Sequence, residues 1–309
     1  MVPGLRQIVI CLLIAIFTHP AVSEAVIYGR DDRMERFAIA HTWLEEFARS
    51  SVALVDSKHI VNIAPGWITI SGKSHIEDRN LCPDERFVYQ PVISGCSGTL
   101  IAPRVVLTAG HCTAPDDENP SFDFCKDTYF IFDFASFSPG SVLVSHPLEN
   151  VYRCRSVLRS VDRDHGLDFA LIELDRDVIG RFPVPMRRYG QLGKDEELIA
   201  IGHPAGLPQK ISAGAFLRTQ GPIFFTANLD VSENSSGSPV FNLHRGFLEG
   251  IVASGEDDYE FDSDRQCNRA KRCPDDGCEG ESVTKASAIF EAIQEIRSLK
   301  WQRLLEPQL

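Results

Sequence analysis

Short apolar runs separated by turn-forming residues recur along most of this chain, and this pattern restricts its fold more than any other feature. Runs of this length between Gly, Pro, Asn, Asp and Ser are typical of β-strands. They predict strands at 51–55, 60–63, 67–70, 87–93, 98–101, 105–109, 129–132, 142–144, 151–157, 169–174, 197–201, 209–213, 216–219, 222–226, 239–241 and 246–253. Short strands at such spacing favour an all-β sandwich or barrel.

The polar, proline-bearing stretch 175–193 divides this pattern and is the best place for a crossing between two all-β halves. Farther on, residues 256–281 are rich in acidic side chains and contain three cysteines, which predicts an ordered loop held by disulfides. Apolar residues at helical spacing then predict a helix over 284–305, with Ile289, Ile293 and Ile296 on one face.

Length and composition indicate a globular chain. Its 309 residues, of which 43% are hydrophobic, can bury a core in one large or two modest domains. Its formal net charge is −12, whereas binding to nucleic acid by charge requires a basic surface. We therefore expect no nucleic-acid partner.

The N-terminus has the pattern of a secretory signal peptide. Arg6 precedes the apolar run 8–17, and small residues follow. This run is shorter than the ~18 apolar residues that predict a membrane-spanning helix, although an uncleaved anchor is the alternative. Cleavage after Ser23 or Ala25 would yield a secreted protein, extracellular or periplasmic, without stable membrane insertion.

Ser236 is the candidate nucleophile because it lies beside a glycine in the polar turn 234–240. A serine hydroxyl is a weak nucleophile by itself. It needs a base to take its proton, a group to orient that base, and donors for the oxyanion that forms.

His111 and Asp168 are candidates for the base and its orienting group. His111 directly follows a predicted strand and adjoins Cys112, which suits a base held in a fixed position. Asp168 begins an apolar strand, where a carboxylate is costly to bury unless it is hydrogen-bonded, and an imidazole N–H is a suitable donor. A structural or surface histidine is the alternative for His111.

These parts resemble the trypsin-like serine proteases of the chymotrypsin fold, and most closely the secreted bacterial branch that includes glutamyl endopeptidases. The resemblance rests on Thr-Ala-Gly-His-Cys (108–112), Asp-Phe-Ala-Leu-Ile (168–172) and Ser-Gly-Ser-Pro-Val (236–240), in the family's order His, Asp, Ser. The lead-in 26–33 also resembles the mature start in that branch. The resemblance covers roughly residues 26–301.

The resemblance implies an all-β fold of two antiparallel six-stranded β-barrels with a C-terminal α-helix. The expected parts are a signal peptide (1–25), a barrel carrying His111 and Asp168 (26–180), a barrel carrying Ser236 (181–283) and a C-terminal helix (284–309).

The resemblance also implies the role of each site residue. His111 would act as general base and then acid, Asp168 would orient it, and Ser236 would form an acyl-enzyme. The backbone N–H groups of Asn234 and Ser236 would form the oxyanion hole, and a Cys96–Cys112 disulfide would hold the base in place.

Two departures from the family pattern lie next to the nucleophile. Asn234 stands where the family usually has glycine, and Ser235 where it usually has aspartate or asparagine. If the backbone at 234 needs a positive φ, asparagine is among the side chains that tolerate it best. These departures motivate an alternative function, a catalytically inactive binding module on the same scaffold.

A preference for substrates with Arg or Lys is predicted from Asp230, which lies six residues before Ser236, where family members with that preference carry an aspartate. An ordinary hydrogen-bonded turn aspartate is the alternative. Ser254 and Gly255, at the end of the run 250–255, resemble the pocket wall that pairs with substrate backbone.

Eight cysteines remain once Cys11 in the signal peptide is set aside, which favours disulfides in an exported protein. Cys125 and Cys154 are the predicted second pair. The last four cysteines allow three connectivities, and zinc held by three of them is the alternative: Cys82, Cys267, Cys273 and Cys278. Calcium at the acidic residues 256–264 is a less frequent outcome than a solvated loop.

We therefore predict a secreted serine endopeptidase, acting on polypeptides as a monomer, without a metal or other cofactor. An esterase using the same three residues is a third, weaker reading.

Overall fold

The first barrel is formed by six antiparallel strands in the closed order β10–β11–β7–β6–β3–β8. The structure is a computed structural model, and it describes residues 26–294 except 41, 116–119, 165 and 256. The strands of this barrel are β3 (Ser51–Asp56), β6 (Ser94–Ala102), β7 (Val105–Thr108), β8 (Thr128–Phe132), β10 (Val151–Asp164) and β11 (Leu167–Leu174).

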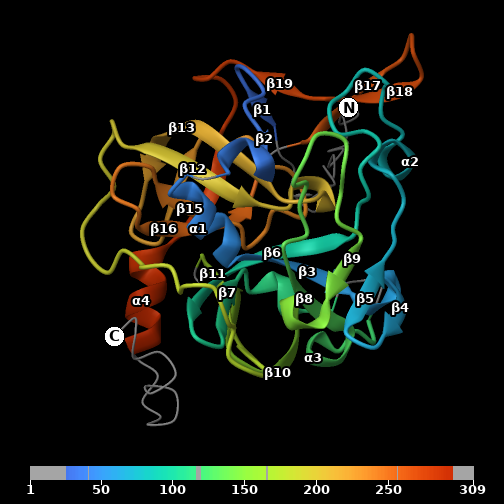
Figure 1. Ribbon diagram of the computed structural model, residues 1–309. Helices are drawn as coiled ribbons and strands as arrows, with labels where there is room; N and C mark the ends of the chain where they lie inside the picture. The colour runs from blue at the N-terminus through green and yellow to red at the C-terminus, as the bar shows by residue number, and fades with distance from the viewer. Residues whose placement is uncertain (1–25, 41, 116–119, 165, 256, 295–309) are drawn as a thin grey trace, which may run out of the picture.

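The second barrel closes through pairing of β12 with both β13 and β15, and β2 (Met34–Glu35) adds an edge strand on β13. In Figure 1 it is drawn mainly in yellow and orange, above the mainly green first barrel. Its six strands are β12 (Glu197–Gly202), β13 (Lys210–Gln220), β14 (Phe224–Ala227), β15 (Pro239–Asn242), β16 (Leu248–Ser254) and β20 (Glu281–Lys285). The predicted fold class is confirmed, whereas the domain limits stay predictions.

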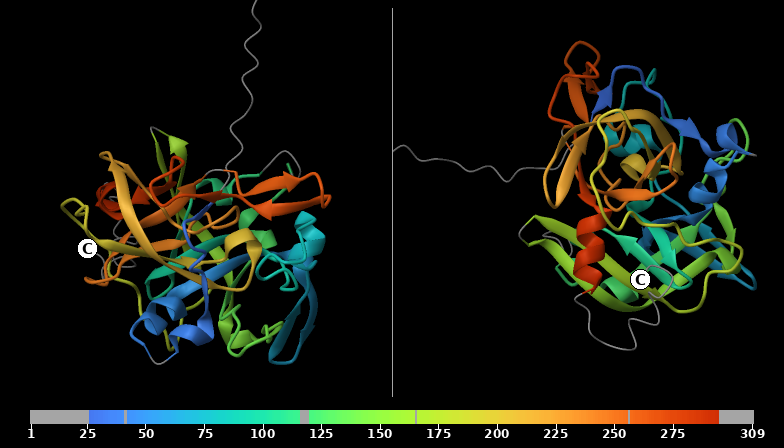
Figure 2. Two further views of the ribbon diagram at one scale, coloured as in Figure 1. Left: turned by 90° about the horizontal axis from the view of Figure 1, so that it is seen from above. Right: turned by 90° about the vertical axis from the view of Figure 1, so that its left-hand side faces the viewer.

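The strands alternate between two cores because successive side chains of a strand point to opposite faces. In β11, Ala170 and Ile172 pack inside the first barrel, while Phe169 and Leu171 pack between the barrels. The apolar face predicted for the C-terminal helix joins this second core: Ile289 and Ile293 of α4 (Ala286–Gln294) lie in it. Figure 2 shows α4 crossing from the second barrel toward the first.

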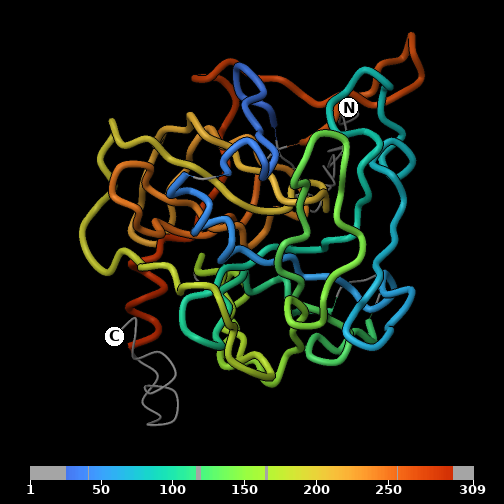
Figure 3. Tube along the Cα trace, in the orientation of Figure 1, coloured from blue at the N-terminus to red at the C-terminus, as the bar shows by residue number. Residues whose placement is uncertain are grey.

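The N-terminal segment spans both barrels. It runs along the second barrel, as the blue tube in Figure 3 shows, and β2 pairs with β13 there. Phe37 N–H then donates to the carbonyl of Ser136, in the first half of the chain. Residues 37–49 contain the end of the 3₁₀ helix η1 (Arg36–Ile39) and most of α1 (Leu44–Ser50).

The remaining elements are short. They are the strands β1 (Ile27–Tyr28), β4 (Ile60–Ala64), β5 (Trp67–Ile70), β9 (Ser145–Pro147), β17 (Tyr259–Asp262), β18 (Cys267–Ala270) and β19 (Arg272–Cys273), the helices α2 (His75–Arg79) and α3 (Phe124–Asp127), and the 3₁₀ helices η2 (Ser57–His59), η3 (His111–Thr113), η4 (Leu148–Asn150) and η5 (Pro204–Gly206). No helix of the described part is long and apolar enough to cross a membrane.

Several predicted elements are wrong. Residues 87–93 form no strand: 87–89 lie in a turn, and Pro91 makes an isolated bridge with Ser74. The strand expected at 142–144 lies at β9 instead. The runs 209–213 and 216–219 belong to one strand, β13, and the expected loop 256–281 contains β17 and β18. The C-terminal helix begins at Ala286, because β20 completes the second barrel first, and its expected end lies outside the described residues.

The four disulfides settle the cysteine pairing. Cys96–Cys112 and Cys125–Cys154 are paired as predicted. The four undecided cysteines pair as Cys82–Cys267 and Cys273–Cys278, which leaves their sulfur atoms unavailable as zinc thiolates. Cys11 lies outside the described residues.

Candidate active site

His111 and Asp168 form a hydrogen-bonded pair at the end of two neighbouring strands of the first barrel. His111 follows β7, Asp168 lies in β11, and these strands pair side by side. His111 Nδ1 lies 2.7 Å from Asp168 Oδ2. With Nδ1–H donating to the carboxylate, Nε2 is left free to accept a proton.

The carboxylate of Asp168 is buried, with 2% of the residue exposed, and it is fully supplied with donors. Its Oδ1 accepts the backbone N–H groups of Gly110 (2.5 Å) and His111 (3.1 Å). Burial raises the pKa of this carboxyl, but the hydrogen bonds from His111 and Gly110 outweigh burial, so the net pKa is below its usual value. The structure thus keeps an anion behind the imidazole.

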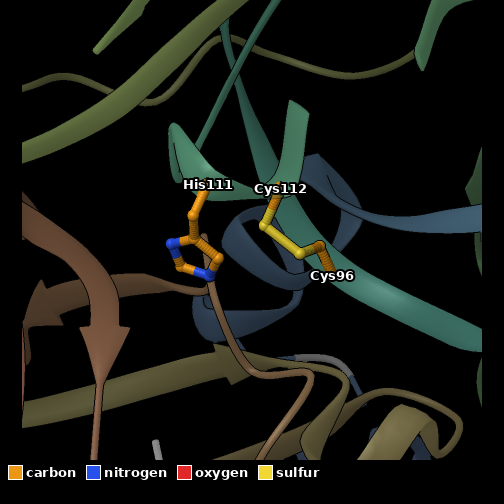
Figure 4. Close-up of side chains that lie close together, drawn as sticks. All are labelled: Cys96, His111 and Cys112. Carbon is orange, nitrogen blue, oxygen red and sulfur yellow. A yellow bond between two sulfur atoms is a disulfide. The ribbon is translucent and has the colours of Figure 1, made fainter. Parts of the chain in front are cut away.

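Gly110 is required by the close packing around this pair. A Cβ at position 110 would lie 2.0 Å from the carbonyl oxygen of Val161 and 3.0 Å from Asp168 Oδ1. The Cys96–Cys112 disulfide fixes the other side of His111, as Figure 4 shows. The ligand atoms of these three labelled residues lie within 4.8 Å of one another, but both sulfur atoms are bonded in the disulfide and cannot act as thiolate ligands of a metal.

The turn that carries Ser236 packs directly on the strands beside His111. Ser97 N–H in β6 donates to the carbonyl of Ser236 (2.8 Å), and that carbonyl also lies 3.9 Å from Cys112 Sγ. Gly237 has φ +81°, and a Cβ there would lie 2.1 Å from the carbonyl oxygen of Ser97. Only glycine therefore lets the turn come this close.

Ser236 itself is partly exposed, and among the described residues its Oγ makes no hydrogen bond to His111 Nε2. Such bonds are often long in structures without substrate and tighten in the complex. The fold thus brings the three predicted residues to one place, with the Asp168–His111 bond formed.

The backbone N–H groups predicted for the oxyanion hole are free. Neither Asn234 N–H nor Ser236 N–H has an acceptor among the described residues. Asn234 has φ +62°, so the left-handed conformation expected at this position is present and asparagine accommodates it. The N–H groups of Ser235 and Ser238, by contrast, donate within the turn to the carbonyls of Ser232 and Ser235.

The contacts of Asp230 agree with the alternative that the sequence left open, a hydrogen-bonded aspartate. Its Oδ1 accepts Tyr28 N–H (2.8 Å) and its Oδ2 accepts Asp32 N–H (3.2 Å), so the buried carboxylate holds the N-terminal segment. Burial raises its pKa to about 7, since the two backbone donors only partly offset the loss of hydration. Its role in substrate binding stays a prediction.

β16 brings the predicted pocket wall beside the nucleophile turn. Gly237 N–H donates to the carbonyl of Val252 (2.8 Å), and Val252 N–H donates to that of Ser238 (2.9 Å). Ser254 ends this strand and Gly255 follows it, both partly buried.

A groove of about 1100 Å³ runs past the site, lined by His111, Asn234 and the strand edge at Ser94 and Gly95. Arg163 also lines this groove, with Nε 3.7 Å from Asp168 Oδ2. Arg163 was not predicted as part of the site, because nothing in its local sequence marks it. Its placement follows from the bulged end of β10, where it has φ +54°.

Comparisons with known proteins bear on the domain family and the fold. The sequence matches the trypsin-like peptidase domain over residues 96–251, just over half of the chain. No curated protein sequence matches significantly.

Two solved structures match most of this chain at low sequence identity. A Glu endopeptidase in complex with MPD is 16% identical, with a TM-score of 0.48, and the match covers 86% of this chain and 96% of that one. The Vibrio cholerae VesB protease is 14% identical, with a TM-score of 0.50 and coverage of 87% and 67%. At this identity the similarity to VesB concerns the fold alone.

Proposed function

The chain belongs to the trypsin-like peptidase family, and on this premise we propose that it is a serine endopeptidase that hydrolyses peptide bonds through an acyl-enzyme. The observation that carries the proposal is the 2.7 Å contact between His111 Nδ1 and Asp168 Oδ2, beside the turn of Ser236. This contact orients the imidazole with Nε2 available as the base.

In the proposed reaction, Ser236 Oγ attacks the scissile carbonyl carbon while its proton passes to His111 Nε2. The N–H groups of Asn234 and Ser236 stabilise the negative oxygen of the tetrahedral intermediate. His111 then gives the proton to the leaving amine, so that the C–N bond breaks and an ester to Ser236 remains. Water attacks this ester with His111 again as base, which releases the acid and restores the serine.

Asp168 supports both steps as an anion behind the imidazole. Its lowered pKa keeps it ionised at neutral pH, and the ionised form stabilises the imidazolium that each proton transfer creates.

The test is cleavage of a denatured protein mixture by the processed protein, its Ser236→Ala variant and its Ser238→Ala variant. We expect cleavage by the wild type and by Ser238→Ala, whose lost hydroxyl is buried in the same turn, and none by Ser236→Ala. An inactive wild type would favour the alternative, a binding module. Equal cleavage by Ser236→Ala would assign the activity to another residue.

Preference for Arg or Lys is the finer part of the proposal. It is supported by the position of Asp230 before Ser236 and opposed by the two backbone N–H groups that already occupy its carboxylate oxygens. Cuts mainly after Arg or Lys would support it. Cuts mainly after Glu or apolar residues would contradict it, and the role of Asp230 would then be to bind the backbone of the N-terminal segment.

We further propose that the protein is exported, with the signal peptide removed. The four disulfides support an oxidising compartment. N-terminal sequencing of the exported protein tests this: a start at Val26 or Glu24 is expected, and a start at Met1 would contradict it.

A further inference from the structure

We propose that Asp258 is a positioning residue for the oxyanion hole, because it holds in place the backbone of Glu233, the residue before Asn234. This inference rests on the proposed function, in which Asn234 N–H binds the oxyanion. Asn234 N–H belongs to the peptide that follows the Cα of Glu233. The bond to Asp258 fixes the peptide that precedes this Cα, and Ala205 N–H fixes the carbonyl of the peptide that follows it. With the backbone of Glu233 held from both sides, the direction of Asn234 N–H is set.

The contact between the two residues is direct. Glu233 N–H donates to Asp258 Oδ2 at 2.8 Å. Only 8% of Asp258 is exposed, and its second oxygen, Oδ1, has no hydrogen-bond partner among the described residues. Burying a carboxyl group is costly. In the described residues, the one hydrogen bond of the Asp258 side chain is the one from Glu233 N–H in the turn.

The rest of Glu233 is also held from outside the turn. Its carbonyl accepts Ala205 N–H (2.7 Å), and its Oε1 lies 2.5 Å from Nε of Arg79 in α2. Arg79 is fixed in turn, since its own carbonyl accepts Nδ2 of Asn268 in β18 (2.6 Å). Neighbouring segments thus hold Glu233 on three sides.

External positioning suits the composition of this turn. Ser235 is uncharged, and its side chain bonds within the turn, because its Oγ accepts Ser232 N–H (3.1 Å). Asn234 is in the left-handed region, which is less favourable for asparagine than for glycine. A turn with these two residues gains a defined geometry from the bond to Asp258, and preorganised donors are what the oxyanion requires.

Burial raises the pKa of the Asp258 carboxyl well above its usual range, although the bond from Glu233 N–H lowers it. The function assigned here needs an acceptor oxygen and no negative charge. An asparagine at this position has such an oxygen at the same distance along its side chain. The Asp258→Asn variant therefore separates the hydrogen bond from the charge.

The experiment measures kcat and KM on a peptide substrate, together with the rate of labelling by a fluorophosphonate, for full-length processed protein. We expect Asp258→Ala to lower kcat and the labelling rate about tenfold to a hundredfold, with KM within about twofold, because a donor is misdirected and not removed. Asp258→Asn should retain most of the activity. Asp257→Ala, at the exposed neighbouring position, is the matched control and should match the wild type.

Wild-type kcat in folded Asp258→Ala would overturn the inference, and so would a loss in folded Asp258→Asn as large as in Asp258→Ala. If Asp258→Ala does not fold, folded Asp258→Leu, which is similar in size and has no acceptor oxygen, takes its place. A lowered kcat in Asp258→Leu beside a retained kcat in Asp258→Asn supports the hydrogen bond, and wild-type kcat in Asp258→Leu overturns it. Failure of the proposed function looks different, because the wild type itself would then show no turnover and no labelling.

Discussion

Two buried aspartates show how the partners of a residue decide its chemistry. Asp168 and Asp230 are both nearly inaccessible, and each accepts two backbone N–H groups. Asp168 also faces His111, and its pKa is lowered, whereas burial and the nearby carboxyl of Asp32 raise the pKa of Asp230 to about 7. The side-chain hydrogen bond with His111 therefore distinguishes the environment of Asp168 from that of Asp230.

Replacement of Asp168 by asparagine tests its role behind His111. The amide cannot stabilise the imidazolium or enforce the required tautomer, so we expect kcat to fall about 10⁴-fold with little change in KM. Steady-state kinetics on a peptide substrate measure this. Asp175→Asn, at an exposed position just after the same strand, should stay near the wild type, and a comparable loss in both variants would contradict the assignment.

The raised pKa of Asp230 predicts how the stability of the folded protein depends on pH. Its pKa is about 7 in the folded protein and about 3.9 in the unfolded chain, so between these values the folded state binds more protons. The free energy of unfolding contributed by this group must then decrease as the pH rises from about 4 to about 7, by at most about 1.4 kcal/mol per pH unit.

Urea unfolding of the wild type and Asp230→Asn at pH 5 and pH 7.5 checks this dependence. The amide of the variant does not titrate, so the variant should gain stability relative to the wild type at the higher pH. The comparison between the two proteins cancels the contribution of groups that both retain. An unchanged difference, or one of opposite sign, would contradict the raised pKa.

Among the secondary-structure elements, the β17–β18 hairpin and β20 show what local sequence patterns cannot predict. Sequence periodicity indicated the main barrel strands well, because their apolar runs follow the strand period. It missed β17, β18 and β20, whose residues are largely charged or polar and are paired through tertiary contacts. It also predicted a strand at 87–93, where Phe87 has φ +62° and its ring contacts Arg86 and Lys210 instead.

The Cys82–Cys267 disulfide joins the segment after α2 to β18, across 185 residues of sequence. The Cys273–Cys278 disulfide spans only 5 residues. Cross-links that close longer loops restrict the unfolded chain more. Removing the first pair should therefore cost about 5 kcal/mol and removing the second about 2 kcal/mol. Denaturant unfolding of the two double alanine variants measures both, and an equal loss or the reverse order would contradict this account.

For the whole molecule, the family resemblance carried by the motifs around His111, Asp168 and Ser236 implied the two barrels. The same resemblance also implied the Cys96–Cys112 pair, which the structure contains. The surroundings of the site were not predictable, because Asp258 and Arg79 are brought to it by tertiary contacts, and the placement of Arg163 depends on the bulged end of β10. A hydrogen-bonded Asp230 was the alternative that the sequence left open, but its donors could not be identified, since they lie about 200 residues earlier.

The central claim is that Ser236 is a nucleophile activated by His111, and covalent labelling tests it most directly. Processed protein is treated with a fluorophosphonate, and the modified peptide is identified by mass spectrometry. The account predicts one adduct on Ser236, none in Ser236→Ala and a strongly slowed reaction in His111→Ala. Absence of an adduct on folded, processed protein, or equal labelling of Ser236→Ala, would contradict it.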